Sequence, residues 1–205
     1  MMAGANEVRL QFLSLEDTEV EGLYMMQEQE MSLLRIPAVF LPPPVTIPLG
    51  EALVLYRVNE AAEEGAPPWR EVARVAVPER VSEAVVLVQT QGERISAAVV
   101  PMENNRFPAG SYMLFNRTPQ VVLIGLDQEV TRIPSQNVRV VRPSIQERKP
   151  MPVYFRFESD EENRSLVSTR WFHNPANREF VFLSTRGDGL EIRVRSVSRR
   201  PQAEE

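Results

Sequence analysis

Cysteine is absent from this sequence of 205 residues, and histidine occurs once, at His173. The first absence excludes disulfides, a thiolate nucleophile and cysteine-ligated zinc. The scarcity of histidine restricts any histidine-dependent metal site or Ser-His triad to one position. Aspartate is also rare: only four of the 28 acidic residues are Asp, which excludes the Asp-rich loops that wrap calcium. We therefore predict no catalytic, cofactor-binding or metal-binding residues and no enzymatic activity.

Long apolar runs and an excess of positive charge are missing as well. No run of 18 apolar residues occurs, so no membrane-spanning segment is expected. The formal net charge of -5 provides no global positive field for phosphate backbones, which argues against nucleic acid as a partner. No signal peptide is visible at the start. A cysteine-free chain suits the outside of a Gram-negative cell, but many cytosolic proteins also have no cysteine, so this absence does not fix the compartment.

What the sequence does contain is a series of short β-branched segments, separated by Pro, Gly and Asn. In the last of them, apolar Ile192 and Val194 alternate with charged Arg193 and Arg195, which is typical of a half-buried antiparallel strand. Many short strands at about ten-residue spacing predict a sandwich or a barrel. The predicted strands are 51–58, 71–77, 83–90, 94–100, 111–116, 120–126, 137–142, 152–158, 165–172, 179–185 and 190–197.

The two halves of the chain resemble each other. Segment 85–100 matches 180–195, segment 33–39 shares Arg-Ile-Pro with 130–136, and 51–60 corresponds in order to 151–160. The first match pairs Val86 with Val181, Thr90 with Thr185, Gly92 with Gly187, and Val99 with Val194. Collinear matches of this kind indicate an internal duplication. We predict an all-β fold of two tandem Ig-like antiparallel β-sandwich domains, residues 1–103 and 104–198, followed by a flexible tail, 199–205.

Residues 19–36 carry conflicting signals. Their Glu, Gln, Met and Leu content favours a helix. The duplication aligns them with 119–133, which is plainly β, so we interpret them as strands and keep the helix as the alternative.

The tripeptide Arg186-Gly187-Asp188 is one that many adhesion ligands present to integrins. Under the duplication it takes the place of Gln91-Gly92-Glu93, where only the glycine is retained. A glycine between two paired strands supplies the positive φ of a tight hairpin, so we interpret the tripeptide as a turn.

Five other features have mainly structural interpretations. His173 is expected as a surface histidine at a strand end, and the acidic segment with Glu158, Asp160, Glu161 and Glu162 as a solvated loop. Pro42-Pro43-Pro44 is expected to protect a sheet edge rather than to bind an SH3-type domain. Trp171 is assigned to the core, with Trp171 or Phe172 facing outward. Asn116-Arg117-Thr118 fits the N-glycosylation pattern, but Pro119 follows it.

Segments 106–118 and 168–197 carry a resemblance to a known group. The first resembles the F-P-x-G-x-Y…N-x-S/T segment of uncharacterised β-sandwich proteins from Verrucomicrobia and related bacteria, and the second resembles their closing hairpins. Those proteins are typically exported and have no assigned activity. The resemblance implies a β-sandwich and an exported protein, so a periplasmic or extracellular location is slightly favoured. It transfers no functional residue.

These observations predict a non-catalytic binding or structural module of the bacterial envelope or exterior that acts through protein contacts. Its partners would be another envelope protein or a glycan. The alternative is a carbohydrate-binding module, which requires Trp69, Trp171 or Tyr112 on one exposed flat face. Two further hypotheses are a glycosidase with a carboxylate pair about 5–10 Å apart in a cleft, and a ring-forming or trimeric phage or secretion component.

Overall fold

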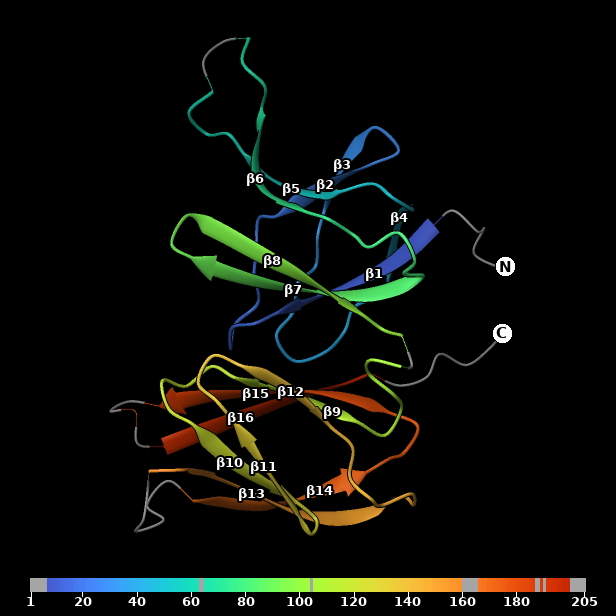
Figure 1. Ribbon diagram of the computed structural model, residues 1–205. Helices are drawn as coiled ribbons and strands as arrows, with labels where there is room; N and C mark the ends of the chain where they lie inside the picture. The colour runs from blue at the N-terminus through green and yellow to red at the C-terminus, as the bar shows by residue number, and fades with distance from the viewer. Residues whose placement is uncertain are drawn as a thin grey trace. The chain divides into compact units, whose positions relative to one another are not determined.

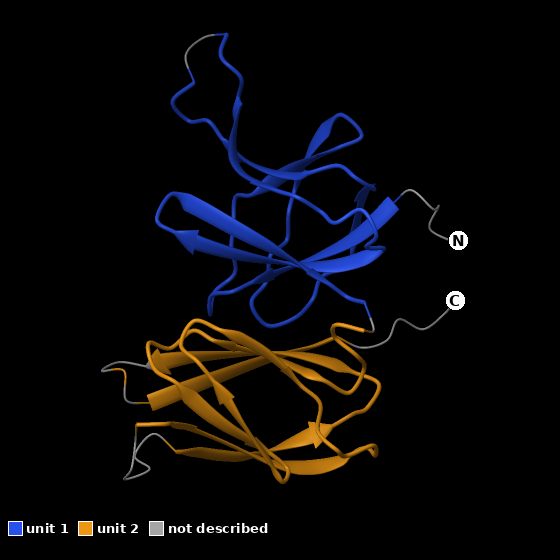
Figure 2. Ribbon diagram, in the orientation of Figure 1, with its two compact units in different colours: residues 1–103 blue, residues 104–205 orange. Residues whose placement is uncertain are grey.

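The structure, a computed structural model, describes residues 7–62, 65–103, 105–159, 166–186, 189 and 191–199. The chain divides into two compact units, unit 1 (residues 1–103) and unit 2 (residues 104–205), which are coloured separately in Figure 2. The expected tail lies outside the described residues except for Arg199, which is the last residue of a strand.

The described residues form strands and no helix, so the all-β prediction is confirmed. Unit 1 contains β1 (Glu7–Ser14), β2 (Tyr24–Gln27), β3 (Glu30–Leu33), β4 (Val45–Pro48), β5 (Leu53–Val58), β6 (Trp69–Val75), β7 (Glu83–Gln91) and β8 (Arg94–Pro101). Unit 2 contains β9 (Tyr112–Asn116), β10 (Val122–Leu126), β11 (Glu129–Ile133), β12 (Val138–Val141), β13 (Lys149–Phe157), β14 (Val167–His173), β15 (Arg178–Arg186) and β16 (Glu191–Arg199).

Each predicted strand segment coincides with an observed strand. Residues 19–36 contain β2 and β3, so the strand interpretation is confirmed and the helix is wrong. The proline-rich segment leads into β4, which is the terminal strand of its sheet, as its edge interpretation requires. The sequence prediction missed β1, although Val8, Leu10 and Phe12 alternate there with Arg9 and Gln11.

The two units have the same topology. Unit 1 has sheets with the strand orders β4-β1-β7-β8 and β3-β2-β5-β6, and unit 2 has β12-β9-β15-β16 and β11-β10-β13-β14, so each strand corresponds to the one eight places later. Figure 1 shows the two sheets of each unit as two layers. One pairing in each unit is parallel, β1 with β7 and β9 with β15, and the other pairings are antiparallel. An identical strand order with an identical parallel pair supports the duplication. The Ig-like connectivity stays a prediction.

Each unit has its own hydrophobic core between its sheets. The largest fully buried side chains of the unit 1 core include Leu10 and Phe12 of β1 and Leu53 and Leu55 of β5. The unit 2 core contains Phe155, with Trp171 packed partly buried against it. Alternate residues of these strands face the core because successive side chains of a strand point to opposite faces.

The central hairpin of unit 1 turns as expected. Gln91 pairs with Arg94, and Gly92 between them has a φ of +62°. Only glycine adopts this left-handed backbone without strain from a Cβ atom, which accounts for a glycine at the turn. Its counterpart Gly187 lies outside the described residues.

The ungapped alignment fails beyond this turn. Val86 and Val181 occupy equivalent places, but Val99 pairs with Val86 whereas Ser196 pairs with Val181. The predicted match of Val99 with Val194 is therefore wrong by two residues. The physical reason is the connection: four residues join β15 to β16, and two join β7 to β8.

The N-glycosylation pattern of unit 2 lies inside the fold. Asn116 is 1% exposed, and its Nδ2 donates hydrogen bonds to the carbonyl oxygens of Gln120, Ile133 and Pro134 at 2.8–3.0 Å. Its Oδ1 accepts hydrogen bonds from the backbone N and the Oγ1 of Thr118 at 3.0 and 2.8 Å. The Asn116 side chain therefore connects β9 to the segment just before β10 and to the end of β11. In the folded protein it is not accessible to a glycosyltransferase.

We expect Asn116→Ala to lower the free energy of unfolding of unit 2 by about 3 kcal/mol or more, because several buried polar groups lose their partners at about 1–3 kcal/mol each. Urea denaturation measures the change. Asn137→Ala is the control, because Asn137 is exposed and its amide makes one long hydrogen bond, 3.4 Å, to Ser135. Equal effects of the two substitutions would contradict the structural role of Asn116.

Candidate functional site

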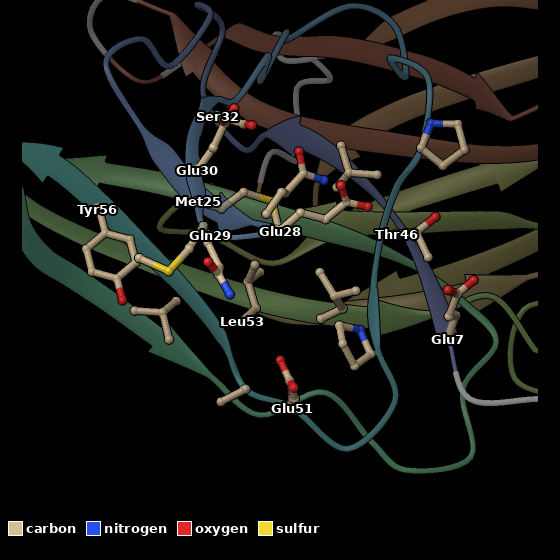
Figure 3. Close-up of a pocket in the computed structure, with 18 residues that line it drawn as sticks. Glu7, Met25, Glu28, Gln29, Glu30, Ser32, Thr46, Glu51, Leu53 and Tyr56 are labelled. Carbon is tan, nitrogen blue, oxygen red and sulfur yellow. The ribbon is translucent and has the colours of Figure 1, made fainter.

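A groove of about 1070 Å³ opens in unit 1 beside the β2–β3 hairpin (Figure 3). It is formed by β2, β3, β4, β5 and the start of β1, so its walls come from both sheets. Its lining residues are mostly polar at the mouth and apolar at the floor: Glu7, Met25, Met26, Gln27, Glu28, Gln29, Glu30, Ser32, Pro44, Val45, Thr46, Ile47, Pro48, Glu51, Ala52, Leu53, Val54 and Tyr56.

The groove exists because two neighbouring strands of unit 1 separate. β2 pairs with β5 at a single position, Tyr24 with Tyr56, and beyond it the β2–β3 hairpin leaves β5. In unit 2 the equivalent strands, β10 and β13, remain paired from Val122 to Leu126. The comparison shows that this topology can close the seam between the two strands, and that unit 1 leaves it open.

A second difference keeps the same side of unit 2 filled. Residues 142–148 connect β12 to β13, and Ile145 from this connection is 7% exposed within the unit 2 core. The corresponding connection in unit 1, residues 49–52, is shorter. Unit 1 therefore has less chain available to cover the space between β4 and β5.

The floor of the groove is apolar. Met25, Ile47 and Leu53 are 2%, 7% and 1% exposed and belong to the unit 1 core. Met26 on the hairpin is 54% exposed, and the half-buried ring of Tyr56 lines the groove nearby. Methionine side chains are flexible and polarisable, so such a surface adapts to different apolar side chains.

The mouth of the groove is acidic. Glu28 and Glu30 lie on the hairpin side, Glu7 begins β1, and Glu51 lies in the connection between β4 and β5 (Figure 3). All of these carboxylates are exposed, and the lining contains no Lys or Arg. Within the described part of the chain, none of them forms an ion pair. The groove therefore presents uncompensated negative charge.

The charge of the whole unit has the same sign. Residues 1–103 contain 16 acidic and 7 basic residues, a net charge of -9, whereas residues 104–205 contain 12 and 16, a net charge of +4. A cleft lined by one sign of charge raises the local concentration of the opposite sign. The overall charge of -5 hides this difference between the two copies.

Two polar residues of the groove, Glu28 and Gln29, form the tip of the β2–β3 hairpin and have a strained backbone conformation. Glu28 and Gln29 have φ values of 47° and 73°, in the left-handed region where glycine and asparagine are usual. A turn of this type matches the twist of two paired strands, and the pairing of Gln27 with Glu30 fixes it. It places Glu28 beside the opening.

His173 lies at a strand end, as predicted, but the prediction of a surface position is wrong. It ends β14, is 1% exposed, and its Nδ1 lies 3.0 Å from the hydroxyl oxygen of Tyr112. Burial lowers the pKa of His173, with a smaller contribution from Arg142 and partial opposition from a hydrogen bond to the backbone of Ile145. Burial also raises the pKa of the Tyr112 hydroxyl. The pair belongs to the interior of unit 2, and both pKa shifts favour the neutral forms.

The aromatic residues proposed for carbohydrate binding do not form one exposed face. Tyr112 is buried and stacks on Trp171 at 5.4 Å between ring centroids, and Trp171 packs against the unit 2 core, as predicted. Trp69 belongs to unit 1, where it is half-buried against Tyr24 at 4.7 Å. Phe172, next to Trp171, is the residue that faces outward, at 67% exposure.

Two sequence features fall largely outside the described residues. Arg186 ends β15 and pairs with Glu191, which supports a hairpin, but Gly187 and Asp188 are not described. In the acidic segment, Glu158 accepts hydrogen bonds from Arg132 at 2.7 and 2.9 Å, which holds its pKa below the ordinary value, and residues 160–165 are not described. Among the described residues, no group of three or more His, Cys, Asp or Glu side chains is placed to hold a metal ion.

Sequence reasoning did not find the groove. Its carboxylates are spread over β1, the β2–β3 hairpin and the β4–β5 connection, and no local motif connects them. One signal was available: the acidic excess of the first half, which the total charge conceals.

Comparisons with known proteins identify no family for this chain. No family model matches the chain, and no curated protein matches it. Among the solved structures that match is a "putative cell adhesion protein" from Bacteroides uniformis, with 9% sequence identity and a TM-score of 0.24, covering 95% of this chain and 98% of that chain. In the described residues, no helix has the length and apolar character that crossing a membrane requires.

The buried His173 generates a prediction about pH. Because its pKa is lowered in the folded state, the unfolded chain takes up a proton first as the pH falls below about 6.5. The contribution of neutral His173 to the free energy of unfolding is complete above pH 6.5, the ordinary pKa of histidine. It is lost as the pH falls towards the lower pKa of His173 in the folded state. We expect the free energy of unfolding of unit 2 to decrease from pH 7 to pH 5, by at most about 1.4 kcal/mol per pH unit from this group.

Urea denaturation followed by Trp171 fluorescence, in a Trp69→Phe background, measures this dependence in unit 2. His173→Gln lowers the stability at pH 7 and reduces the slope between pH 7 and pH 5. The same slope in both proteins would show that His173 does not contribute to it.

Proposed function

We propose that the protein is a non-catalytic binding module of the bacterial envelope or exterior, that it acts through protein contacts, and that the groove of unit 1 is its binding site. The observation that carries the proposal is the open seam between β2 and β5, which lies next to an apolar floor and an acidic mouth. Concave sites with a largely apolar floor and a few polar groups are typical of binding sites.

The separated strands favour a polypeptide ligand over a small molecule. Beyond Tyr24, no described strand pairs with the β5-facing edge of β2. A strand edge of this kind offers main-chain donors and acceptors, which an extended segment of another protein can use. The matching seam of unit 2 is occupied by its own strands, so the proposal assigns binding to unit 1.

The carboxylates at the mouth do not favour a glycosidase. That chemistry needs one carboxylic acid shielded from solvent so that it retains its proton, beside a second carboxylate. Glu7, Glu28, Glu30 and Glu51 are all exposed. The carbohydrate-binding alternative lacks the exposed flat face of Trp69, Trp171 or Tyr112 on which it depends.

Selection from a displayed library of random 12-residue peptides on the immobilised full chain tests the proposal. We expect peptides that bind the wild-type protein and lose binding to Ser32→Tyr, because Ser32 of β3 lines the groove and a tyrosine there fills it. Thr131→Tyr is the matched control: Thr131 of β11 is the equivalent residue of unit 2, since Ser32 pairs with Met25 as Thr131 pairs with Ile124.

Thermal melts establish that both variants fold. Peptides that bind Ser32→Tyr as well as the wild type, or a selection that enriches no peptide, would overturn the assignment of the groove. A glycan array in parallel checks the alternative: a saccharide that binds the wild type and not Ser32→Tyr would favour carbohydrate binding.

A further inference from the structure

The groove that we propose as the binding site also defines the chemistry of its ligand, and this inference rests on that proposed function. We infer that the groove takes an extended polypeptide segment in which Lys or Arg alternates with aliphatic residues, bound as an added strand at the β2–β5 seam. Three independent features of unit 1 support this: the strand edge, the apolar floor and the acidic mouth.

The strand edge sets the conformation of the ligand. In unit 2 the seam is closed by antiparallel pairing along Val122–Leu126, which shows that the geometry of this sheet supports main-chain hydrogen bonds there. In unit 1 that pairing stops after Tyr24 and Tyr56. An extended segment supplies the missing main-chain donors and acceptors, whereas a helix uses its own internally.

The edge that remains free on β4 is a poorer candidate for strand addition. β4 ends at Pro48 and is preceded by Pro44, and proline has no N–H to donate. The β2 segment Tyr24–Gln27 contains no proline. The seam between β2 and β5 is therefore the edge to which we assign the added strand.

The floor and the mouth set the side chains of the ligand. Successive residues of an extended chain point in opposite directions, so one set faces the floor and the other faces away from it. The floor set meets the partly exposed apolar lining, Val45, Val54 and the ring of Tyr56, which favours aliphatic side chains. The other set reaches the mouth, where Glu28 and Glu30 stand opposite Glu51, which favours Lys or Arg.

The experiment uses the full-length protein and three synthetic hexapeptides with blocked termini. One alternates Lys and Val, the second contains the same residues as a Lys block followed by a Val block, and the third alternates Glu and Val. We expect the alternating Lys-Val peptide to bind most tightly by isothermal titration calorimetry, and its affinity to fall as salt is raised. The Glu-Val peptide should not bind.

Two substitutions connect that binding to the groove. Glu30→Gln should lower the affinity for the Lys-Val peptide about threefold, because a single exposed charge pair contributes little to binding. The combination of Glu28→Gln, Glu30→Gln and Glu51→Gln should lower it more than about tenfold, because three such pairs are lost together. Glu129→Gln is the matched control, because Glu129 follows the β10–β11 turn as Glu30 follows the β2–β3 turn. It should leave the affinity unchanged.

A peptide with N-methyl groups on alternate backbone nitrogens tests the added strand itself. It keeps every side chain and loses half of its main-chain donors, so it should bind at least tenfold more weakly if strand pairing holds it. Equal affinity of the methylated and unmethylated peptides, or of the alternating and block peptides, would overturn the added-strand inference and leave a purely electrostatic contact.

The outcomes separate this inference from the function on which it rests. If the Lys-Val peptide fails while the library selects other peptides that Ser32→Tyr excludes, the groove binds protein segments and the inferred chemistry is wrong. If neither the Lys-Val peptide nor any library peptide binds at the groove, the proposed function fails as well.

Discussion

The pairing of the second strand with the fifth is the contact on which the character of each unit depends. Both units have the same strand order. In each unit, the hairpin that contains the second strand joins the rest of its sheet only by pairing with the fifth strand. In unit 2 the seam is paired along Val122–Leu126, and Ile145 fills the adjacent side of the core. In unit 1 pairing at Tyr24 alone anchors the hairpin, and a groove takes the place of the lost pairs. A local difference in hydrogen bonding thus separates a closed sandwich from an open one.

Among the described residues, the closed copy contains four of the five buried polar side chains, and Ser14 of β1 is the one in unit 1. Asn116 and Thr118 satisfy one another and three main-chain carbonyls, and His173 pairs with Tyr112, all within unit 2. Buried polar groups of this kind are stabilising only when their partners are present, so they tie unit 2 to one arrangement. Unit 1 instead has four carboxylates at the exposed mouth of its groove, and none of them forms an ion pair within the described residues. The two copies have diverged in where they use polarity, as well as in shape.

The sequence predicted the features that depend on local patterns. Alternation and turn residues located most of the strands, although not β1, and a glycine at position 92 identified the β7–β8 turn. Features that depend on distant pairing were missed. The parallel neighbour of β1 is β7, more than 70 residues away, and nothing within β1 specifies it. The surface prediction for His173 is wrong because its buried partner Tyr112 lies 61 residues away, and no local pattern indicates that contact.

The groove was beyond sequence reasoning for a related reason: it results from pairs that do not form. An unpaired strand edge beside exposed Met26 would also be a site for aggregation between copies of the chain. The carboxylates at the mouth change this, because a second copy would bring another acidic unit, with the same net charge of -9, towards the acidic edge. Like charges at close approach are destabilising, whereas a basic segment meets the opposite sign. The negative charge of the acidic mouth therefore disfavours pairing between two copies and favours binding of a cationic partner. Because unit 1 has a net charge of -9, it can keep an open seam without associating with itself.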